Sequence, residues 1–306
     1  MIRQHPFVSQ LFGRNSLIFL AFALLIACVL LKPKVLPRPA YNFQLTYDIS
    51  QSMDVRDYIV DEKPASRLSI AKQATAKLLQ KLPCGSNIGY SVFTGRRVVT
   101  LVTPVEVCQH YAGLLNSLSM INDDMRWTQS SGVGKGLHQS IRSVDGIGNS
   151  TRVIFMTDGQ EAPPLGPDQR GMPKTDRFPV QGIIVGLGGT TAVRIPKTYD
   201  NEGRITSYWQ ADEVVQRSDT TLGPSHEELS KRQDSHLGKL GRLANLVYLP
   251  LNSPEQLIDT AMVESMAHRK MVAVDLRWIP AGIALLLLCL RFLPTGFLFS
   301  RRKSLV

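Results

Sequence analysis

The chain has 306 residues, of which 43% are hydrophobic, so it can form one full domain of about 100–200 residues and further segments. Its formal net charge of +10 comes from the ends: residues 1–40 hold five Lys or Arg and residues 278–306 hold four, without any acidic residue. The middle of the chain keeps 26 basic and 25 acidic residues, and this balance excludes a nucleic-acid-binding surface.

Residues 16–31 form an uninterrupted apolar run between Arg14 and Lys32. The run is slightly shorter than the about 20 residues of a membrane span, but basic flanks can extend it by snorkelling. We predict a transmembrane helix rather than a cleaved signal peptide, because no small-residue cleavage site follows. Leu25-Ile26-Ala27-Cys28 resembles a lipoprotein processing site, so lipidation of Cys28 is the alternative. Either outcome exports the middle of the chain.

Apolar and aromatic residues alternate along residues 42–48, which predicts a strand. Asp48, Ser50 and Ser52 follow on alternate positions and offer one carboxylate and two hydroxyls. Hard cations such as Mg²⁺ prefer oxygen ligands, and this set leaves charge and coordination positions for an outside acidic group. By itself the motif is also compatible with a polar turn.

Helices and a hairpin are predicted next. Leucines at helical spacing and a following Pro-Cys-Gly predict a helix over residues 66–82. Residues 88–93 and 98–102 are expected to form a hairpin with a Gly-containing turn, and residues 105–118 and 134–144 to form helices.

Four cysteines are present, and two of them, Cys28 and Cys289, lie in the apolar end segments. Cys84 and Cys108 are therefore the only pair in the middle of the chain. In an oxidising compartment such a pair is most simply a disulfide, with two unpaired buried thiols as the alternative.

Two later segments offer further oxygen ligands. Residues 152–157 form an apolar run that ends at Asp158, and Ser131 precedes the predicted helix 134–144. Open parallel sheets bind ligands at the carboxyl ends of their strands, so we expect Asp158 and Ser131 to converge with Asp48.

The remaining pattern predicts the fold class. The runs at residues 152–157 and 180–186 are typical of strands buried on both faces, and residues 245–249 are expected to be the last strand. A closing helix is predicted from Ser253, with Gln256 placed for a capping box. Alternating strands and helices predict a doubly wound α/β domain. Residues 160–179 and 188–225 are predicted to be long loops.

A second apolar segment, residues 278–299, precedes the basic cluster Arg301-Arg302-Lys303. The positive-inside rule places this cluster in the cytoplasm. Two spans then place residues 1–15 and 300–306 inside and a domain of residues 41–270 outside. Basic residues just after the first segment oppose this topology.

Together, the Asp-x-Ser-x-Ser motif at Asp48, the hydroxyl at Ser131 and the Thr-Asp-Gly at Asp158 resemble the metal-ion-dependent adhesion site of von Willebrand factor type A domains. The resemblance implies a Rossmann-like fold with a mostly parallel sheet and five metal ligands: Asp48, Ser50, Ser52, Ser131 and Asp158. It implies Mg²⁺ as the first choice, with Ca²⁺ or Mn²⁺ as alternatives. In this family the third-loop ligand is usually a Thr that a Leu follows six positions later. That spacing to Leu137 selects Ser131, while Thr128 has the usual residue type but not the spacing and is the alternative.

No catalytic residue is predicted. The six histidines show no metal-ligand spacing, and no Gly-x-Ser-x-Gly elbow surrounds a serine. The glycines at residues 186–189 lack the complete dinucleotide-binding pattern. We therefore expect a binding protein rather than an enzyme.

Short blocks at residues 54–58, 63–68, 82–86, 104–108 and 157–164 resemble MxaL-type accessory proteins of bacterial methanol oxidation. That resemblance implies an inner-membrane protein whose periplasmic domain helps to mature methanol dehydrogenase, by Ca²⁺ insertion. Its partner would be the dehydrogenase or a sister accessory protein, bound through an acidic residue. The alternatives are a general envelope scaffold or stress protein of the aerotolerance type, and a structural domain with a vestigial metal site.

Overall fold

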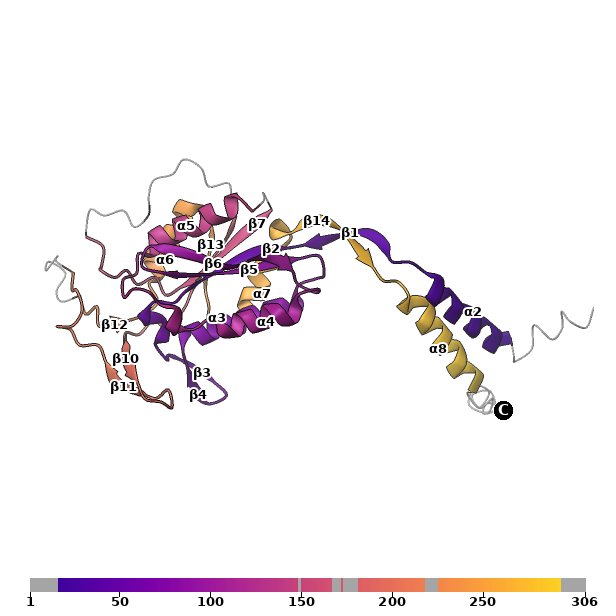
Figure 1. The fold of residues 1–306 in the computed structure, drawn as a ribbon, viewed down its shortest axis with the longest axis horizontal. Helices are drawn as coiled ribbons and strands as arrows, with labels where there is room; N and C mark the ends of the chain where they lie inside the picture. The colour runs from indigo at the N-terminus through magenta and orange to yellow at the C-terminus, as the bar shows by residue number, and fades with distance from the viewer. Residues whose placement is uncertain (1–15, 148–149, 167–171, 173–180, 218–224, 293–306) are drawn as a thin grey trace, which may run out of the picture. The chain divides into compact units, whose positions relative to one another are not determined.

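A six-stranded sheet forms the centre of residues 39–270, one of two compact units in the chain. The structure is a computed structural model and describes residues 16–147, 150–166, 172, 181–217 and 225–292. The sheet has the strand order β13-β8-β7-β2-β5-β6 (Figure 1). Its strands are β2 (Asn42–Asp48), β5 (Asn87–Thr94), β6 (Arg97–Glu106), β7 (Thr151–Thr157), β8 (Gly182–Gly186) and β13 (Val247–Pro250). Only the edge strand β6 runs antiparallel to its neighbour, so the predicted mostly parallel α/β sheet is confirmed.

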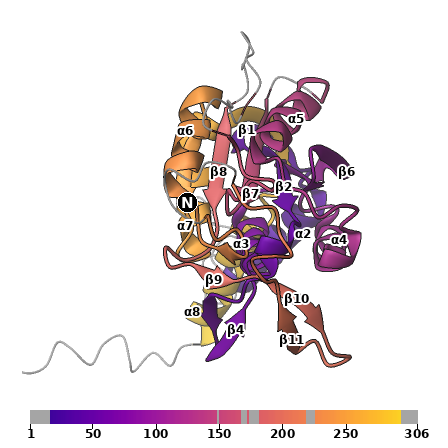
Figure 2. The same ribbon diagram turned by 90° about the vertical axis from the view of Figure 1, so that its left-hand side faces the viewer.

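Helices cover both faces of this sheet (Figures 1 and 2). One face packs against α3 (Arg67–Lys81), α4 (Tyr111–Met120) and α7 (Glu255–Ala261), and the other against α5 (Val133–Asp145) and α6 (Asp234–Ala244). Along β7, Ile154 and Met156 belong to the first core and Val153 and Phe155 to the second, as expected for a strand buried on both faces.

Helix α3 follows the predicted boundaries closely. The Ser66 hydroxyl accepts a hydrogen bond from the Ser69 amide (3.2 Å) and so caps the amino end. The helix ends at Lys81, and Leu82 is already extended before Pro83. This backbone change is what a following proline favours.

The predicted helix over residues 105–118 is wrong in its first half. Strand β6 continues through Glu106, because Val105 pairs with Ile88 of β5, and α4 begins only at Tyr111. Between them, Cys108 forms the predicted disulfide with Cys84 (Cα–Cα 5.3 Å). The bridge joins the end of β6 to the turn before β5.

The strand predicted over residues 245–249 begins later than expected. Helix α6, which the sequence pattern did not reveal, ends at Ala244, and Asn245 follows in the left-handed conformation (φ 57°). Strand β13 therefore starts at Val247. In the closing helix α7, Gln256 accepts from the Ser253 amide, but no side chain caps the helix start.

Small antiparallel sheets lie outside the central one. They are formed by β3 (Tyr58–Val60) with β4 (Lys63–Ala65), β9 (Val193–Arg194) with β12 (Leu229–Ser230), and β10 (Pro196–Tyr199) with β11 (Ile205–Tyr208). Short 3₁₀ turns are η1 (Gln51–Asp54), η2 (Asp123–Met125) and η4 (Glu264–Met266). The stretch predicted as an irregular loop over residues 188–225 thus contains short strands, and we call residues 193–230 the insertion. Residues 167–171, 173–180 and 218–224 of the two predicted loops lie outside the described residues.

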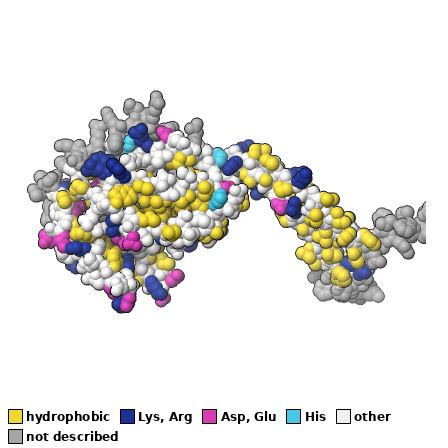
Figure 3. All heavy atoms as spheres, in the orientation of Figure 1, with side chains coloured by type: hydrophobic (Ala, Val, Ile, Leu, Met, Phe, Trp, Pro, Cys, Tyr) yellow, Lys and Arg dark blue, Asp and Glu magenta, His cyan; other side chains and the backbone are white. Residues whose placement is uncertain are grey.

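The second unit consists of residues 1–38 and 271–306. Its described part contains α2 (Ser16–Leu30) and α8 (Trp278–Phe292), over which hydrophobic side chains gather (Figure 3). Strand β1 (Lys34–Ala40) pairs with β14 (His268–Val274). Among the described residues, no helix has both the length and the apolar character needed to cross a membrane. The two spans predicted at residues 16–31 and 278–299 stay predictions, and residues 293–299 lie outside the described part.

Candidate metal site

The carboxyl ends of β2 and β7 bring the two predicted aspartate ligands to one edge of the sheet. These strands are parallel neighbours, and Tyr47 pairs with Met156. Asp48 therefore lies level with Thr157, and Asp158 follows one residue later. Both side chains are completely buried, with an exposed fraction of 0%. The sequence prediction that these residues converge agrees with this placement.

Asp48 is oriented by its neighbours. One carboxylate oxygen, Oδ1, accepts from the Ser50 amide (2.8 Å), and Oδ2 accepts from the Thr157 hydroxyl (2.6 Å). The pKa of Asp48 is raised to about 7, mainly by burial and secondly by the negative charge of Asp158. Among the described residues Asp48 has no cationic side chain as a partner. A bound cation would therefore stabilise its charged form.

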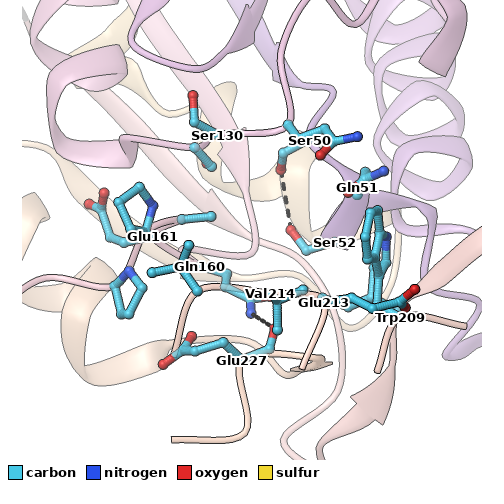
Figure 4. Close-up of a pocket in the computed structure, with 17 residues that line it drawn as sticks. Ser50, Gln51, Ser52, Ser130, Gln160, Glu161, Trp209, Glu213, Val214 and Glu227 are labelled. Atoms are coloured by element: carbon cyan, nitrogen blue, oxygen red, sulfur yellow. Dashed lines mark hydrogen bonds between the residues drawn. The ribbon is translucent and has the colours of Figure 1, made fainter. Parts of the chain in front are cut away.

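The first loop presents two hydroxyls above this carboxylate. The oxygens of Ser50 and Ser52 lie 3.2 Å apart, and both residues are nearly buried (4% and 5% exposed). The loop is fixed to the neighbouring strand by a hydrogen bond from the Ile49 amide to the Phe93 carbonyl (2.9 Å). Figure 4 shows Ser50 and Ser52 on one side of an open space.

Ser131 lies beside the same space. Its backbone pairs with Ala162 in both directions (2.7 Å each), which fixes the loop before α5 to the loop after β7. The Ser131 hydroxyl is buried and has no hydrogen-bond partner among the described residues. Buried hydroxyls are normally paired, so an unpaired one on a residue that lines the same cavity as Ser50 and Ser52 fits a cation ligand.

Thr128, the alternative to Ser131, is engaged elsewhere. Its hydroxyl lies 3.1 Å from the Ser130 hydroxyl and accepts from the Ser130 amide (3.3 Å). It does not line the cavity that Ser50, Ser52 and Ser131 share. The geometry therefore favours Ser131 as the ligand.

Asp158 is held by a buried arginine whose role the sequence analysis missed. Arg67 is completely buried and donates to Asp158 Oδ2 (2.7 Å) and to the Ser52 carbonyl (3.3 Å). Its other nitrogens contact both carboxylate oxygens of Asp57 (2.7–3.2 Å). Ser230 of the insertion also donates to Asp158 (2.9 Å). Arg67 thus shares its one positive charge between Asp158 and Asp57 and ties Asp158 to the first loop.

A signal for Arg67 was present in the sequence. Helix α3 buries Ile70, Ala74 and Leu78, and Arg67 falls on the same face at helical spacing. Charged residues are almost never fully buried unless they are paired, so a cation on an apolar face indicates buried carboxylate partners.

The cavity above the ligands has a volume of about 240 Å³. Ser50, Ser52 and Ser131 are among the residues that line it, whereas Asp48 and Asp158 are fully buried and do not line it. In Figure 4 the labelled side chains surround one space, with Glu161 across from Trp209. The cavity thus gives an outside group access to the side of the site that carries the hydroxyl residues.

Comparison with known proteins bears on the fold of the domain. The family model described as von Willebrand factor type A domain matches residues 45–160, a range that contains all five predicted ligands. A UPF0353 protein from Nocardia farcinica is 23% identical over 232 residues, which cover 66% of this chain and 63% of that protein. A UPF0353 protein from Mycolicibacterium gilvum is 25% identical over 142 residues, or 44% of this chain and 38% of its own length. The chain thus spans less than two thirds of the length of these relatives.

Among solved structures, BatB from Bacteroides thetaiotaomicron has a TM-score of 0.50 at 18% identity and covers 74% of this chain and 98% of its own. An aerotolerance-related membrane protein from Bacteroides fragilis has a TM-score of 0.47 at 18% identity and covers 72% and 96%. From the family match and the similarity to BatB, the chain has a von Willebrand factor A-like fold. The more specific resemblance to MxaL-type proteins stays a prediction.

Proposed function

We propose that this chain is a divalent-cation-dependent protein-binding scaffold, with Mg²⁺ as the first choice and Ca²⁺ or Mn²⁺ as alternatives. The observation that supports it most is the buried Ser131 hydroxyl, which has no partner among the described residues and shares a cavity with Ser50 and Ser52. These hydroxyls, with Asp48 and Asp158 beneath them, would hold the cation.

The open coordination expected at the site favours an acidic partner. Arg67 carries one positive charge for Asp57 and Asp158 together, and Asp48 has no cationic neighbour in the described structure. A bound divalent cation would balance the remaining carboxylate charge and leave a coordination position for an outside oxygen ligand. Ser50, Ser52 and Ser131 orient it toward the cavity, so a carboxylate of a partner protein can reach it from that side.

The site supports a general scaffold better than a factor specific to methanol dehydrogenase. The blocks that resemble MxaL-type proteins have roles inside the domain: residues 54–58 supply Asp57, residues 63–68 supply Arg67, and residues 82–86 and 104–108 supply the disulfide. These contacts give the four sequence blocks a structural role that does not depend on binding to methanol dehydrogenase. An envelope scaffold of the aerotolerance type is therefore our first proposal, and maturation of methanol dehydrogenase is the second.

The disulfide supports an exported domain. Disulfides persist in oxidising compartments, and Cys84–Cys108 has normal Cα geometry (5.3 Å). We therefore propose that residues 41–270 lie in the periplasm of a bacterium, anchored in the inner membrane through residues 16–31 and 278–299.

A strain that lacks this chain distinguishes the envelope-scaffold proposal from the methanol-dehydrogenase proposal. For a general scaffold, growth on methanol and Ca²⁺ loading of the dehydrogenase are expected to equal those of the parent. Poor growth on methanol with Ca²⁺-free dehydrogenase, restored by the intact chain but not by Asp48→Ala, would instead establish the maturation role.

A further inference from the structure

The insertion builds an apolar wall of the cavity at the candidate metal site. Ile195, Trp209, Val214 and Val215 line the cavity beside Ser50 and Ser52. Ile195 is buried, whereas Val215 is 68% exposed and offers a free apolar surface. Figure 4 shows Trp209 and Val214 bordering the space that Ser52 faces.

We infer, on the basis of the proposed function, that the bound partner segment pairs an acidic residue with an adjacent bulky apolar residue such as Phe or Leu. The acidic side chain reaches the cation, and the apolar side chain packs against the wall of Ile195, Trp209, Val214 and Val215.

The wall is held firmly in place. The Trp209 amide donates to the Ile195 carbonyl (3.1 Å), and the Lys197 amine lies 4.8 Å from the centre of the Trp209 ring. Gln160, two residues after Asp158, donates from Nε2 to the carbonyls of Glu227 and Leu229 (3.2 and 3.1 Å). The insertion is thus tied directly to the loop that carries a predicted ligand.

Two further buried polar atoms on residues lining the cavity have no hydrogen-bond partner in the described part of the chain. They are the indole nitrogen of Trp209, a donor, and Oε1 of Gln160, an acceptor. Buried groups of this kind normally have partners. A peptide backbone offers both an acceptor and a donor, so an extended partner segment would satisfy them if the two side chains turn toward it.

Carboxylates at the cavity do not oppose an acidic partner strongly. Glu161 accepts from the amides of Val133 and Gly134 (3.0 and 3.1 Å) and lies 3.1 Å from His236. Glu213 pairs with Lys197. Both side chains therefore have polar or charged partners. The third carboxylate that lines the cavity is Glu227; burial raises its pKa, and the charge of Arg217 acts in the opposite direction.

The size of the cavity favours a peptide over a small metabolite. At about 240 Å³ it is smaller than typical small-molecule pockets of roughly 300–1,000 Å³. It suits one or two side chains of a larger partner, whose remaining surface would lie outside the cavity.

Synthetic peptides test the inference on the full-length chain. We would measure binding of acetyl-Gly-Gly-Phe-Glu-Gly-Gly-amide in Mg²⁺ and in EDTA. The same measurement would be made with peptides in which Leu-Glu, Glu-Phe, Ser-Glu or Phe-Gln replaces the central Phe-Glu. The best of the Phe and Leu peptides is expected to bind about ten-fold more tightly than Ser-Glu, because burying such a side chain provides that difference. Binding is expected to disappear in EDTA and with Phe-Gln.

Variants of the wall residues test whether the preference for an apolar side chain arises at the cavity. Val215→Ser and Trp209→Ser should reduce the preference for Phe-Glu over Ser-Glu, and Trp209→Phe should keep most of it. Val99→Ser is the matched control, because Val99 is also partly exposed (45%) but lies on β6 and does not line the cavity. Val215 is exposed, so its replacement tests the wall even if the Trp209→Ser variant fails to fold.

The outcomes separate the inference from the proposed function. Calorimetry that shows cation binding, together with equal affinities for the Phe, Leu and Ser peptides or no peptide binding, would overturn the inference and leave the cation site standing. Absence of cation binding would overturn both.

Discussion

Replacing Arg67 by Gln is expected to destabilise the domain strongly. Arg67 is completely buried and is the cationic partner of two carboxylates, Asp158 (0% side-chain exposure) and Asp57 (8%). Removing one partner of a buried ion pair typically costs about 3–5 kcal/mol, because a charge stays buried without compensation. We expect a loss in that range, since Gln can replace some hydrogen bonds but not the charge.

Equilibrium denaturation of the full-length chain in EDTA measures this loss, because EDTA prevents a cation from masking the unpaired carboxylates. Arg204→Gln is the matched control: its side chain is 71% exposed in its ion pairs with Asp200 and Glu202, so about 0–1 kcal/mol is expected. A loss for Arg67→Gln as small as that of the control would refute the argument that Arg67 holds the site together.

Three further predictions follow from the site and the disulfide. Cys84→Ser should lower the free energy of unfolding by about 2–4 kcal/mol, while Cys28→Ser, which changes a free cysteine, should not; equal melting temperatures with and without reductant would contradict this. Ser131→Ala should weaken Mg²⁺ binding by about ten-fold or more in calorimetry, and Thr128→Ala should change it little; the reverse order would select Thr128. The folded-state pKa of Asp48, about 7, lies above its ordinary 3.8, so this group should cost the cation-free chain stability as the pH rises from 3.8 to 7. Asp48→Asn should remove that part of the pH dependence in thermal unfolding, and an unchanged profile would argue against the raised pKa.

The sequence could predict the main sheet because its signals are local. Alternation along β2 and the apolar run of β7 identify strands, and parallel pairing then brings Asp48 and Asp158 to one edge. Helix α3 was likewise predictable, since its cap and its stop both lie next to it in the chain.

Other features depend on contacts between distant residues. Arg67 and Asp158 are 91 positions apart, and no periodicity links them. The residues of the apolar wall at Trp209 lie outside the short strands of the insertion, so no strand or helix periodicity marks them. The early part of the predicted helix at residues 105–118 failed because Val105 satisfies a strand pattern as well as a helical one, and its pairing with Ile88 decides between them.

Titration calorimetry of the full-length chain with Mg²⁺, Mn²⁺ and Ca²⁺ tests the central claim most directly. We expect one binding site for at least one of these cations, lost in Asp48→Ala and retained in the Val99→Ser control. A chain that binds none of them, or an Asp48→Ala variant that binds as well as the parent, would contradict it.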